Sequence, residues 1–461
     1  MELQHLGQPF RLSSTFCYVS LLSIALYALQ LFLKAAYYTF FGALSKFPGP
    51  KLNAFSILPY LWTVWSGNEP ASMIALHKKY GPIVRFAPNR ISFLGDSQTW
   101  KDIYGFQKTG QQLPYKDLHL FNTPLNGTPS IILANDNIHA RHRKILSNAF
   151  SDKALKEQEP LMKRWASLFQ AKLAEKATSG DKVDMVKMLN CTTFDIMADL
   201  TFAEPLYMLE NSEYSPWVKS IFLSIKKAAI IRCIRYYSAL TNYLIDKSFV
   251  WIPSIREQQM RHWKYTAERV DRRLATTPDR PDLWSRILAK GQGTGGLSLA
   301  EQHSNAGVFM SAGTETTATA LSGILFHLAR HPEIMQRVKA ELNDAFDSKD
   351  DLHLEPLARC KYMEAVLKEG MRVYPSVPVG LPRIIPEGGA TINGYFIPEG
   401  TNVSIPGLAS GRADCNWVDP DTFAPERWLG EPKYANDKRD SVEPFSIGPR
   451  NCLGKVGLFC P

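Results

Sequence analysis

The chain carries the stretch Phe445-Ser-Ile-Gly448-Pro-Arg450-Asn-Cys452-Leu-Gly454. A single cysteine is most often a small buried hydrophobic residue, but the neighbours of this one point to another use. Gly448 and Gly454 permit a tight loop and a close approach of the backbone to a flat group. Arg450 could pair with a carboxylate, and Phe445 could shield the sulfur of Cys452 from water. A thiolate protected in this way is a proximal ligand of haem iron that favours O–O cleavage.

The stretch matches every fixed position of FxxGxRxCxG, the haem-loop pattern of the cytochrome P-450 haem-thiolate monooxygenases. The chain resembles this family from its N-terminal apolar segment to residue 455. In its overall residue pattern the sequence is most similar to fungal secondary-metabolism members, in particular the isotrichodermin C-15 hydroxylase group. The resemblance implies a triangular, helix-rich fold that is mainly α with small β-sheets. It also implies haem b as the cofactor, with Cys452 as the axial thiolate ligand of the iron.

The resemblance further implies an activity and partners. The enzyme would hydroxylate or epoxidise an apolar secondary metabolite, terpenoid or polyketide-like, with O2. Electrons would come from NADPH through an NADPH-cytochrome P-450 reductase. Apolar stretches that could line the substrate pocket lie at 120–133, at 217–252, around Ala312 and at 377–381.

Composition limits the other possibilities. The 461 residues are 45% hydrophobic and 21% charged, which excludes a wholly disordered or collagen-like chain. The net charge of +9 is scattered, so we expect no nucleic-acid partner. A basic face towards anionic lipid or an acidic protein remains open, as does a merely solvated surface. Seven widely spaced cysteines without a CxxC motif favour a reducing compartment over a disulfide framework or a zinc site.

The N-terminal region predicts a membrane anchor. Phe16 to Leu33 carries no charge over 18 residues, enough to cross the ~30 Å hydrocarbon layer. A cleaved signal peptide is the alternative, but its apolar region would be shorter and no small-residue cleavage site is evident. Lys34, Lys46 and Lys51 all follow the span, so we expect the bulk of the chain to face the cytosol.

These signals predict a single-pass protein of the endoplasmic reticulum membrane. Phe47-Pro-Gly-Pro50 reads as a stiff, bent connector after the anchor. The expected segments are a luminal tail at 1–15, an anchor with an interfacial stretch at 16–44, a hinge at 45–51 and a haem-thiolate catalytic domain at 52–461.

The body of the chain reads as mostly helical with short strands. Residues 83–95 predict a small hairpin, and residues 137–290 are mainly helical. Ser298 and Glu301 form a capping box that starts a helix of about 32 residues, which ends at His331-Pro332. A second helix spans 362–374, and short strand-like pieces follow. The GQGTGG segment at 291–296 is predicted to be a linker, because it follows a helical pattern and lacks the phosphate-loop lysine.

The long helix contains Ala312-Gly313-Thr-Glu315-Thr316-Thr317. Threonine hydroxyls can bend a helix by bonding back to a carbonyl. An acid beside an alcohol could relay protons, although an exposed pair on an alanine-rich helix would look the same. The resemblance implies that Ala312 and Gly313 form a groove for dioxygen over the haem. It assigns Thr316 as the hydroxyl that supports O–O cleavage and Glu315 as its acidic neighbour.

Glu369 and Arg372 share one face of the second helix. Such a pair alone says nothing of function. Arg427 lies downstream in Phe423-Ala-Pro-Glu-Arg-Trp428, which is similar to the PERF element of the family. The resemblance implies that Glu369, Arg372 and Arg427 form a buried structural triad.

The two haem propionates need cations. By resemblance these are Arg450, Arg383 and the His139–Arg143 pair, an HxxxR segment in place of the family's WxxxR. We expect His142 to be a bystander.

The sequence departs from the family pattern at its end. Only nine residues follow Cys452, where the family continues with a long helix and a terminal hairpin. Two alternatives therefore stay open beside the monooxygenase. One is a truncated, non-catalytic and haem-poor remnant, or an incorrect gene structure such as an unspliced intron. The other is a reductase-independent isomerase or dehydratase of the same family, against which the intact pair of Glu315 and Thr316 argues.

Overall fold

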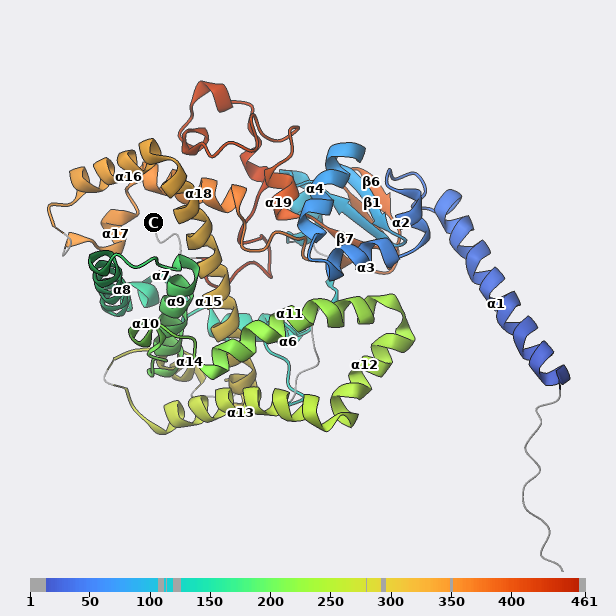
Figure 1. Ribbon diagram of the computed structural model, residues 1–461, viewed down its shortest axis with the longest axis horizontal. Coiled ribbons are helices and arrows are strands. Elements are labelled where there is room, and N and C mark those ends of the chain that lie inside the picture. Colours follow the sequence, from blue (N-terminus) through green and yellow to red (C-terminus); the bar gives the residue numbers. More distant parts are fainter. Residues whose placement is uncertain are drawn as a thin grey trace, which may run out of the picture.

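In the residues that the structure describes, helices predominate and two small sheets accompany them (Figure 1). The computed structural model describes residues 14–106, 112, 114–118, 126–278, 280–291, 296–348 and 351–455. The expected luminal tail up to residue 13, most of the 291–296 linker and residues 456–461 lie outside this description. The predicted fold class, mainly α with small β-sheets, is confirmed.

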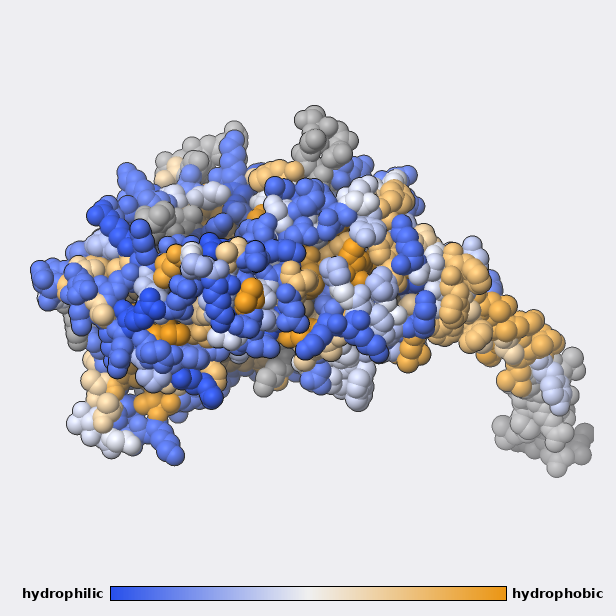
Figure 2. Space-filling view, turned by 90° about the horizontal axis from the view of Figure 1, so that it is seen from above, coloured by the Kyte–Doolittle hydropathy of each residue, from blue (hydrophilic) through white to orange (hydrophobic). Residues whose placement is uncertain are grey.

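Helix α1, Ser14–Phe40, projects away from the rest of the molecule (Figure 1). Its segment Tyr18–Phe40 is long and apolar enough, by length and composition, to cross a membrane. The space-filling view shows hydrophobic residues along this projecting helix (Figure 2). Aromatic side chains connect this helix to the rest of the protein, since the ring centroids of Phe32 and Phe55 lie 5.3 Å apart.

The connector after α1 is fastened to the first strand. The carbonyl of Pro48 accepts a hydrogen bond from the backbone N–H of Arg85 at 2.7 Å. A Cβ atom at Gly49 would lie 2.1 Å from the Arg85 carbonyl oxygen, so only glycine fits this close approach. The connector is therefore held on the sheet. It is followed by α2 (Lys51–Phe55), α3 (Leu58–Trp65) and α4 (Glu69–Tyr80).

Five short strands form the larger sheet, in the order β1-β2-β7-β4-β3. Strands β1 (Ile83–Ala87) and β2 (Arg90–Phe93) pair antiparallel, which confirms the predicted hairpin. Strand β7 (Asn402–Ser404) runs parallel to β2, while β4 (Arg383–Ile384) pairs antiparallel with β7 and with β3 (Tyr115–Lys116). Strands β5 (Ala390–Ile392) and β6 (Tyr395–Ile397) form a separate hairpin.

Most helices of the protein lie between β2 and β4 in the sequence. These helices are α5 (Ser97–Tyr104), α6 (Asp136–Leu146), α7 (Asp152–Lys156), α8 (Glu159–Ser179), α9 (Met185–Phe202), α10 (Met208–Asn211), α11 (Pro216–Tyr237), α12 (Ala239–Trp251), α13 (Pro253–Ala275), α14 (Leu283–Gly291), α15 (Leu299–Arg330), α16 (Pro332–Ala345), α17 (Leu354–Leu357) and α18 (Lys361–Val373). After β4, α19 (Gly407–Gly411) and the 3-10 helices η3 (Pro425–Trp428), η4 (Pro432–Tyr434) and η5 (Arg439–Ser441) lead to the C-terminal loop.

Helix α15 runs through the middle of the helical part (Figure 1). It starts at the predicted capping box, in which the hydroxyl of Ser298 and the carboxylate of Glu301 exchange hydrogen bonds with each other's backbone N–H. It is 32 residues long and ends before His331, as predicted. The largest hydrophobic cluster surrounds it, with Phe309 and Met310 from α15 packed among residues of neighbouring helices such as Phe194.

Candidate active site

The loop that contains Cys452 is closed by backbone hydrogen bonds. The N–H of Cys452 donates to the carbonyl of Phe445 at 2.8 Å, and the N–H of Asn451 donates to that of Gly448 at 3.2 Å. Gly448 has a φ of +76°, and a Cβ there would lie 2.0 Å from the carbonyl oxygen of Tyr104. The glycine is therefore required both by its backbone conformation and by the close approach to α5.

The thiol of Cys452 is free, and the residue has solvent-exposed surface. Enough protein still surrounds the sulfur that burial raises the pKa of the Cys452 thiol, while the N–H of Gly454 and the charges of Arg143 and Lys455 lower it. Among the described residues no group of three or more His, Cys, Asp or Glu side chains could hold a metal ion. A metal at Cys452 would therefore need most of its ligands from a non-protein group.

Two of the predicted cations fasten this loop to helix α6. Both terminal nitrogens of Arg143 donate to Asn451, one to its carbonyl and one to its Oδ1, at 2.6 Å each. Arg450 donates to the Ala134 carbonyl and to Oδ1 of Asp136, each at 2.8 Å. The structure thus brings Arg143 and Arg450 together beside Cys452.

His139 lies in the same group. Its side chain is buried, and this burial, together with Arg450 and Arg143, lowers the pKa of His139 to about 4. The imidazole is therefore neutral near pH 7 and can donate a hydrogen bond from one ring nitrogen. His142, the expected bystander, is fully buried and contacts Oε1 of Glu301 at 3.0 Å.

Arg383 reaches the same region from the sheet. It is buried, and its guanidinium carbon lies 5.0 Å from the centroid of the Tyr104 ring. Directly opposite in the β3–β4 pair stands Lys116, whose Nζ donates to the Ile132 carbonyl at 2.8 Å. Burial, Arg383 and Arg450 lower the pKa of Lys116 to about 7.

Lys116 was missed by the sequence reasoning. The only signal that could have found it is the register of a two-residue strand, which no short-range pattern predicts. Two like charges placed directly opposite each other in a sheet are destabilising, and more so when buried. The cross-strand cations Lys116 and Arg383, with Arg450 and Arg143 nearby, form a site suited to an anionic ligand.

The predicted oxygen-handling segment lies in the middle of α15. Ala312 and Thr316 are exposed although residues on the other faces of this helix are buried. The two lie one turn apart on the same face, and the hydroxyl of Thr316 donates to the Ala312 carbonyl at 2.6 Å. The helix continues through this segment without a break. A Cβ at Gly313 would lie 2.8 Å from the Met197 methyl carbon, so this glycine permits close packing against α9.

Glu315 occupies a different face of α15 from Thr316. Its side chain is partly buried, and this burial raises the pKa of the Glu315 carboxyl. Its buried Oε1 has no hydrogen-bond partner within the part of the chain that the structure describes. A carboxyl in this state holds a proton more readily than an ordinary glutamate.

Glu369, Arg372 and Arg427 lie together in the interior, and none of the three is solvent-exposed. Oε1 of Glu369 is 2.7 Å from Nη2 of Arg372 and 3.0 Å from Nε of Arg427. Arg372 also donates to the carbonyls of Pro420 and Thr422, at 2.7 and 2.9 Å. The group therefore ties α18 to the segment before η3.

Three further partners of this triad were not predicted. The indole N–H of Trp428 donates to Oε2 of Glu369 at 2.9 Å, and the backbone N–H of Ala424 donates to Oε1 at the same distance. Asp437 pairs with Arg427 and balances its charge. The two contacts with Glu369 span 59 and 55 positions, and Asp437 lies ten positions after Arg427 in no recognised motif, so spacing alone could not reveal them.

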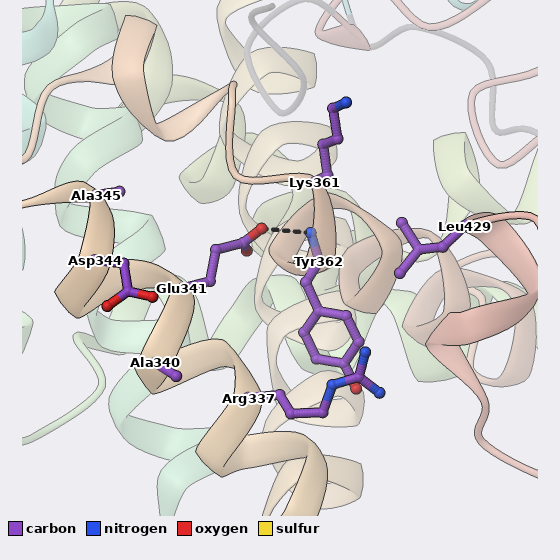
Figure 3. Close-up of a pocket in the computed structure, with 8 residues that line it drawn as sticks. All are labelled: Arg337, Ala340, Glu341, Asp344, Ala345, Lys361, Tyr362 and Leu429. Atoms are coloured by element: carbon purple, nitrogen blue, oxygen red, sulfur yellow. Dashed lines mark hydrogen bonds between the residues drawn. The ribbon is translucent and has the colours of Figure 1, made fainter.

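A surface depression beside α18 supports the same helix. Its residues come from α16, the start of α18 and Leu429 (Figure 3). The carboxylate of Glu341 accepts hydrogen bonds from the backbone N–H groups of Tyr362 and Met363, each at 2.8 Å. Arg337 lies 4.0 Å from the centroid of the Tyr362 ring. Glu341 thus caps the N-terminus of α18 and helps to position the helix that carries Glu369.

Part of the predicted substrate-facing surface can be placed. Val377 and Leu381, which follow α18, are 41% and 38% exposed despite their apolar side chains. The hydroxyl of Ser376 donates to the Thr316 carbonyl at 2.6 Å, so this segment adjoins the exposed face of α15. Residues 217–252 form most of α11 and all of α12. Residues 120–125 lie outside the described part of the chain.

These residues fit haem. Cys452 supplies a single thiolate, and the cations beside it suit two propionate carboxylates. Ala312 and Thr316 leave an uncovered face in the middle of the longest helix of the catalytic part. Leu453, next to the thiol, packs against the same hydrophobic cluster to which α15 contributes.

Comparison with known proteins agrees with this fit. The sequence model of the family described as Cytochrome P450 matches residues 48–456. Cytochrome P450 monooxygenase efuB of Hormonema carpetanum is 46% identical over 94% of this chain and 86% of that protein.

Two further fungal relatives extend the comparison. Cytochrome P450 monooxygenase FUM2 of Gibberella moniliformis is 40% identical over 91% of this chain and 88% of its own length. Cytochrome P450 monooxygenase lcsI of Purpureocillium lilacinum is 37% identical over 96% and 86%, respectively. These three relatives are fungal members of the cytochrome P450 family, and the chain therefore belongs to this family of monooxygenase enzymes.

Proposed function

We propose that this protein is a haem-dependent monooxygenase that hydroxylates or epoxidises an apolar secondary metabolite, terpenoid or polyketide-like. The observation that carries the proposal is the closed loop around Cys452, fastened to α6 by Arg143 and Arg450. When bound there, haem b supplies the activation of O2 with electrons derived from NADPH. An NADPH-cytochrome P450 reductase is the proposed electron donor.

In this proposal Cys452 would ligate the haem iron and the surrounding cations would hold the cofactor. Arg450, Arg383 and Arg143 would neutralise the propionates, and neutral His139 would donate a hydrogen bond. We add Lys116 to this set, because it stands opposite Arg383 in the sheet. Phe445, Gly448 and Gly454 would shape the loop so that the thiolate is held at the cofactor.

Residues of α15 handle protons and oxygen. Thr316 lies on the exposed face of the helix, and its hydroxyl donates its one proton to the Ala312 carbonyl. To donate a hydrogen bond to a group on that face, the hydroxyl would turn away from this carbonyl. Glu315 has a raised pKa, and its Oε1 has no hydrogen-bond partner among the described residues, so it can pass a proton towards this face. Ala312 lies on this exposed face and has little side-chain volume, which leaves room for dioxygen beside the helix, whereas Gly313 packs against Met197 of α9.

The buried triad has a structural role in this account. Among the described residues, no hydrogen bond of Glu369, Arg372 or Arg427 reaches the loop at Cys452 or the exposed face of α15. They join α18 to the chain that leads into the loop. Their replacement would act through stability and cofactor retention.

The N-terminal helix suggests where the enzyme works. We propose that residues 16–44 form a single-pass anchor with an interfacial stretch in the endoplasmic reticulum membrane. Residues 1–15 would then be luminal, residues 45–51 a hinge, and the catalytic domain from residue 52 would face the cytosol. The apolar length of Tyr18–Phe40 supports the anchor, and the lysines after it support the orientation.

Reconstitution with a fungal NADPH-cytochrome P450 reductase tests the proposed reaction. A panel of terpenoid and polyketide substrates is incubated with isotopically labelled dioxygen, and products are analysed by mass spectrometry. Incorporation of one labelled oxygen atom, dependent on NADPH, is the expected result. Equal turnover with and without NADPH, with no labelled oxygen in the product, would identify a reductase-independent isomerase or dehydratase instead.

A further inference from the structure

The C-terminal half of α11 rests on the sheet side of the molecule. Cys233 of α11 belongs to a hydrophobic cluster with Tyr60, Leu61 and Val64 of α3. Its thiol lies 3.5 Å from the Leu61 carbonyl. Figure 1 shows α11 passing beside α3, while α12 turns back towards α13. The junction between α11 and the sheet is therefore a packed contact.

One ion pair joins α11 to α4 across this junction. Arg232 of α11 pairs with Oε2 of Glu69, and the hydroxyl of Tyr60 donates to the other carboxylate oxygen at 3.0 Å. The side chains of Arg232 and Glu69 are only 14% and 11% exposed. Because this pair is shielded from water, its attraction is stronger than that of a surface pair.

A second polar group joins α11 to β2 and β7. The hydroxyl of Tyr236 donates to Asp117 at 2.9 Å, and the amide of Asn402 donates to the same oxygen at 2.8 Å. Arg90 lies 3.7 Å from this carboxylate, and its guanidinium stacks 3.8 Å above the ring of Tyr236. Two residues of one helix turn, Arg232 and Tyr236, thus make both connections.

A small, partly enclosed chamber lies between the two groups. Its volume is about 20 Å³, and Arg90, Arg232, Asn402 and Gly380 are among the residues that line it. Three buried atoms of these residues have no hydrogen-bond partner in the described part of the chain, namely Nε of Arg90, Nε of Arg232 and Oδ1 of Asn402. Arg90 and Asn402 are 6% and 3% exposed, so bulk water does not satisfy them.

We propose that this chamber binds one water molecule, and that the hydrated cluster is a latch that holds α11 and α12 down over the substrate pocket. The water accepts from the two Nε–H groups and donates to Oδ1 of Asn402, so all three atoms are satisfied. A volume of this size suits one buried water, which typically makes about three hydrogen bonds.

The latch acts on a segment that is otherwise weakly held. Helix α12 packs chiefly on α11 and α13, and its apolar residues Leu240 and Tyr243 are 66% and 54% exposed. Arg235 of α11 pairs with Asp246 of α12 at 2.6 Å, so an ion pair links the two helices. Gly380 lies in the 377–381 segment, so the chamber borders the proposed substrate pocket. The role in substrate access rests on the proposed function, whereas the latch itself does not.

Hydrogen exchange of the haem-loaded protein tests the latch directly. The variant Arg232→Met removes the ion pair and one N–H of the chamber. We expect about tenfold faster exchange in peptides that cover 229–251, and unchanged exchange in α9. Tyr236→Phe removes only one hydroxyl and should give a smaller change in the same peptides. This milder variant keeps the proposal testable if Arg232→Met folds poorly.

Arg235→Met is the matched control. It removes an arginine of the same helix whose ion pair lies within the α11–α12 unit. It should speed exchange in α12 without loosening the last turns of α11 from the sheet. Equal exchange in Arg232→Met and the wild type, or the same pattern in both arginine variants, would overturn the latch.

Two further readouts separate the parts of the proposal. Association of phenylimidazole, followed by the Soret shift, should be several-fold faster in Arg232→Met than in the wild type; an unchanged rate overturns the role in access. Loss of haem from the wild type would contradict the proposed function, while the exchange result would still report on the latch.

A high-resolution crystal structure tests the water molecule itself. It should show one water bonded to Arg90 and Asn402, and an empty chamber would overturn the proposed hydration.

Discussion

Lys116 and Arg383 stand directly opposite each other in the antiparallel pair of β3 and β4. Both side chains are largely removed from water, and burial lowers the pKa of each. A pair of like charges in this position opposes folding unless an anion joins it. Two carboxylates of a bound cofactor would turn the repulsion into a favourable interaction, so the pair links folding to cofactor binding.

Replacement of Lys116 by methionine should therefore have opposite effects on the two forms of the protein. The haem-free form should gain roughly 0.2–1 kcal/mol of unfolding free energy, because a like-charge pair is removed. The haem-loaded form should lose haem about tenfold faster, because a charged hydrogen bond is lost. Denaturant melts of both forms and haem transfer to apomyoglobin measure these effects.

Lys116→Arg is the matched control for the charge, and it should retain haem like the wild type. Equal loss of haem from Lys116→Met and the wild type would exclude the lysine from the cofactor site. A drop in the stability of both forms would assign it a purely structural role through its bond to Ile132.

The triad predicts a large effect on stability. Glu369→Gln leaves Arg372 and Arg427 without their shared carboxylate in a fully buried position. We expect a loss of ~3–5 kcal/mol of unfolding free energy, measured by chemical denaturation. Glu364→Gln on the exposed side of α18 breaks only a surface pair with Lys368 and should cost less than ~0.5 kcal/mol. Similar losses in both variants would contradict the buried role.

Acid should destabilise the protein partly through His77. Burial lowers the pKa of His77 to about 4, partly offset by its bond to the Gly81 carbonyl. Between about pH 6.5 and pH 4 the unfolded chain binds a proton that the folded protein does not, so stability falls as the pH falls through this window. The contribution is of order 3 kcal/mol in total.

The variant His77→Gln should flatten this part of the stability profile, which urea melts across pH 4 to 7 would record. His139 titrates in the same range and should leave a residual slope. A profile in His77→Gln as steep as that of the wild type would contradict the assignment.

The hydroxyl of Thr316 should matter for product formation and not for folding. In Thr316→Ala we expect product formation to fall by roughly a hundredfold, with NADPH still consumed and haem content unchanged. Thr317→Ala removes the neighbouring hydroxyl, which bonds to the Gly313 carbonyl at 3.0 Å, and should retain most activity. The ratio of product to NADPH consumed is the measurement. Equal ratios in the two variants would exclude a special role for Thr316.

Local patterns predicted much of the fold. The hairpin at 83–95, the capping box at Ser298 and the long helix up to His331 depend on neighbouring residues, and all are present. The second helix lies within one residue of its expected bounds. The structure also places Cys452 in a tight loop that is closed by its backbone hydrogen bond to Phe445.

The contacts around the site could not be predicted in the same way. Lys116 meets Arg383 across 267 positions only because two very short strands pair in one register. Trp428, Asp437 and Glu341 support the triad or its helix through side chains from distant segments. Such contacts depend on packing of the whole chain, which periodicity and spacing do not encode.

The central claim is that Cys452 ligates haem iron in this protein. Its most direct test is the absorption spectrum of the reduced, carbon-monoxide-bound protein in membranes, with Cys452→Ser prepared in parallel. We predict the red-shifted Soret band of a thiolate-ligated haem in the wild type and its absence from Cys452→Ser. No such band in the wild type, or the same band in both proteins, would contradict the account.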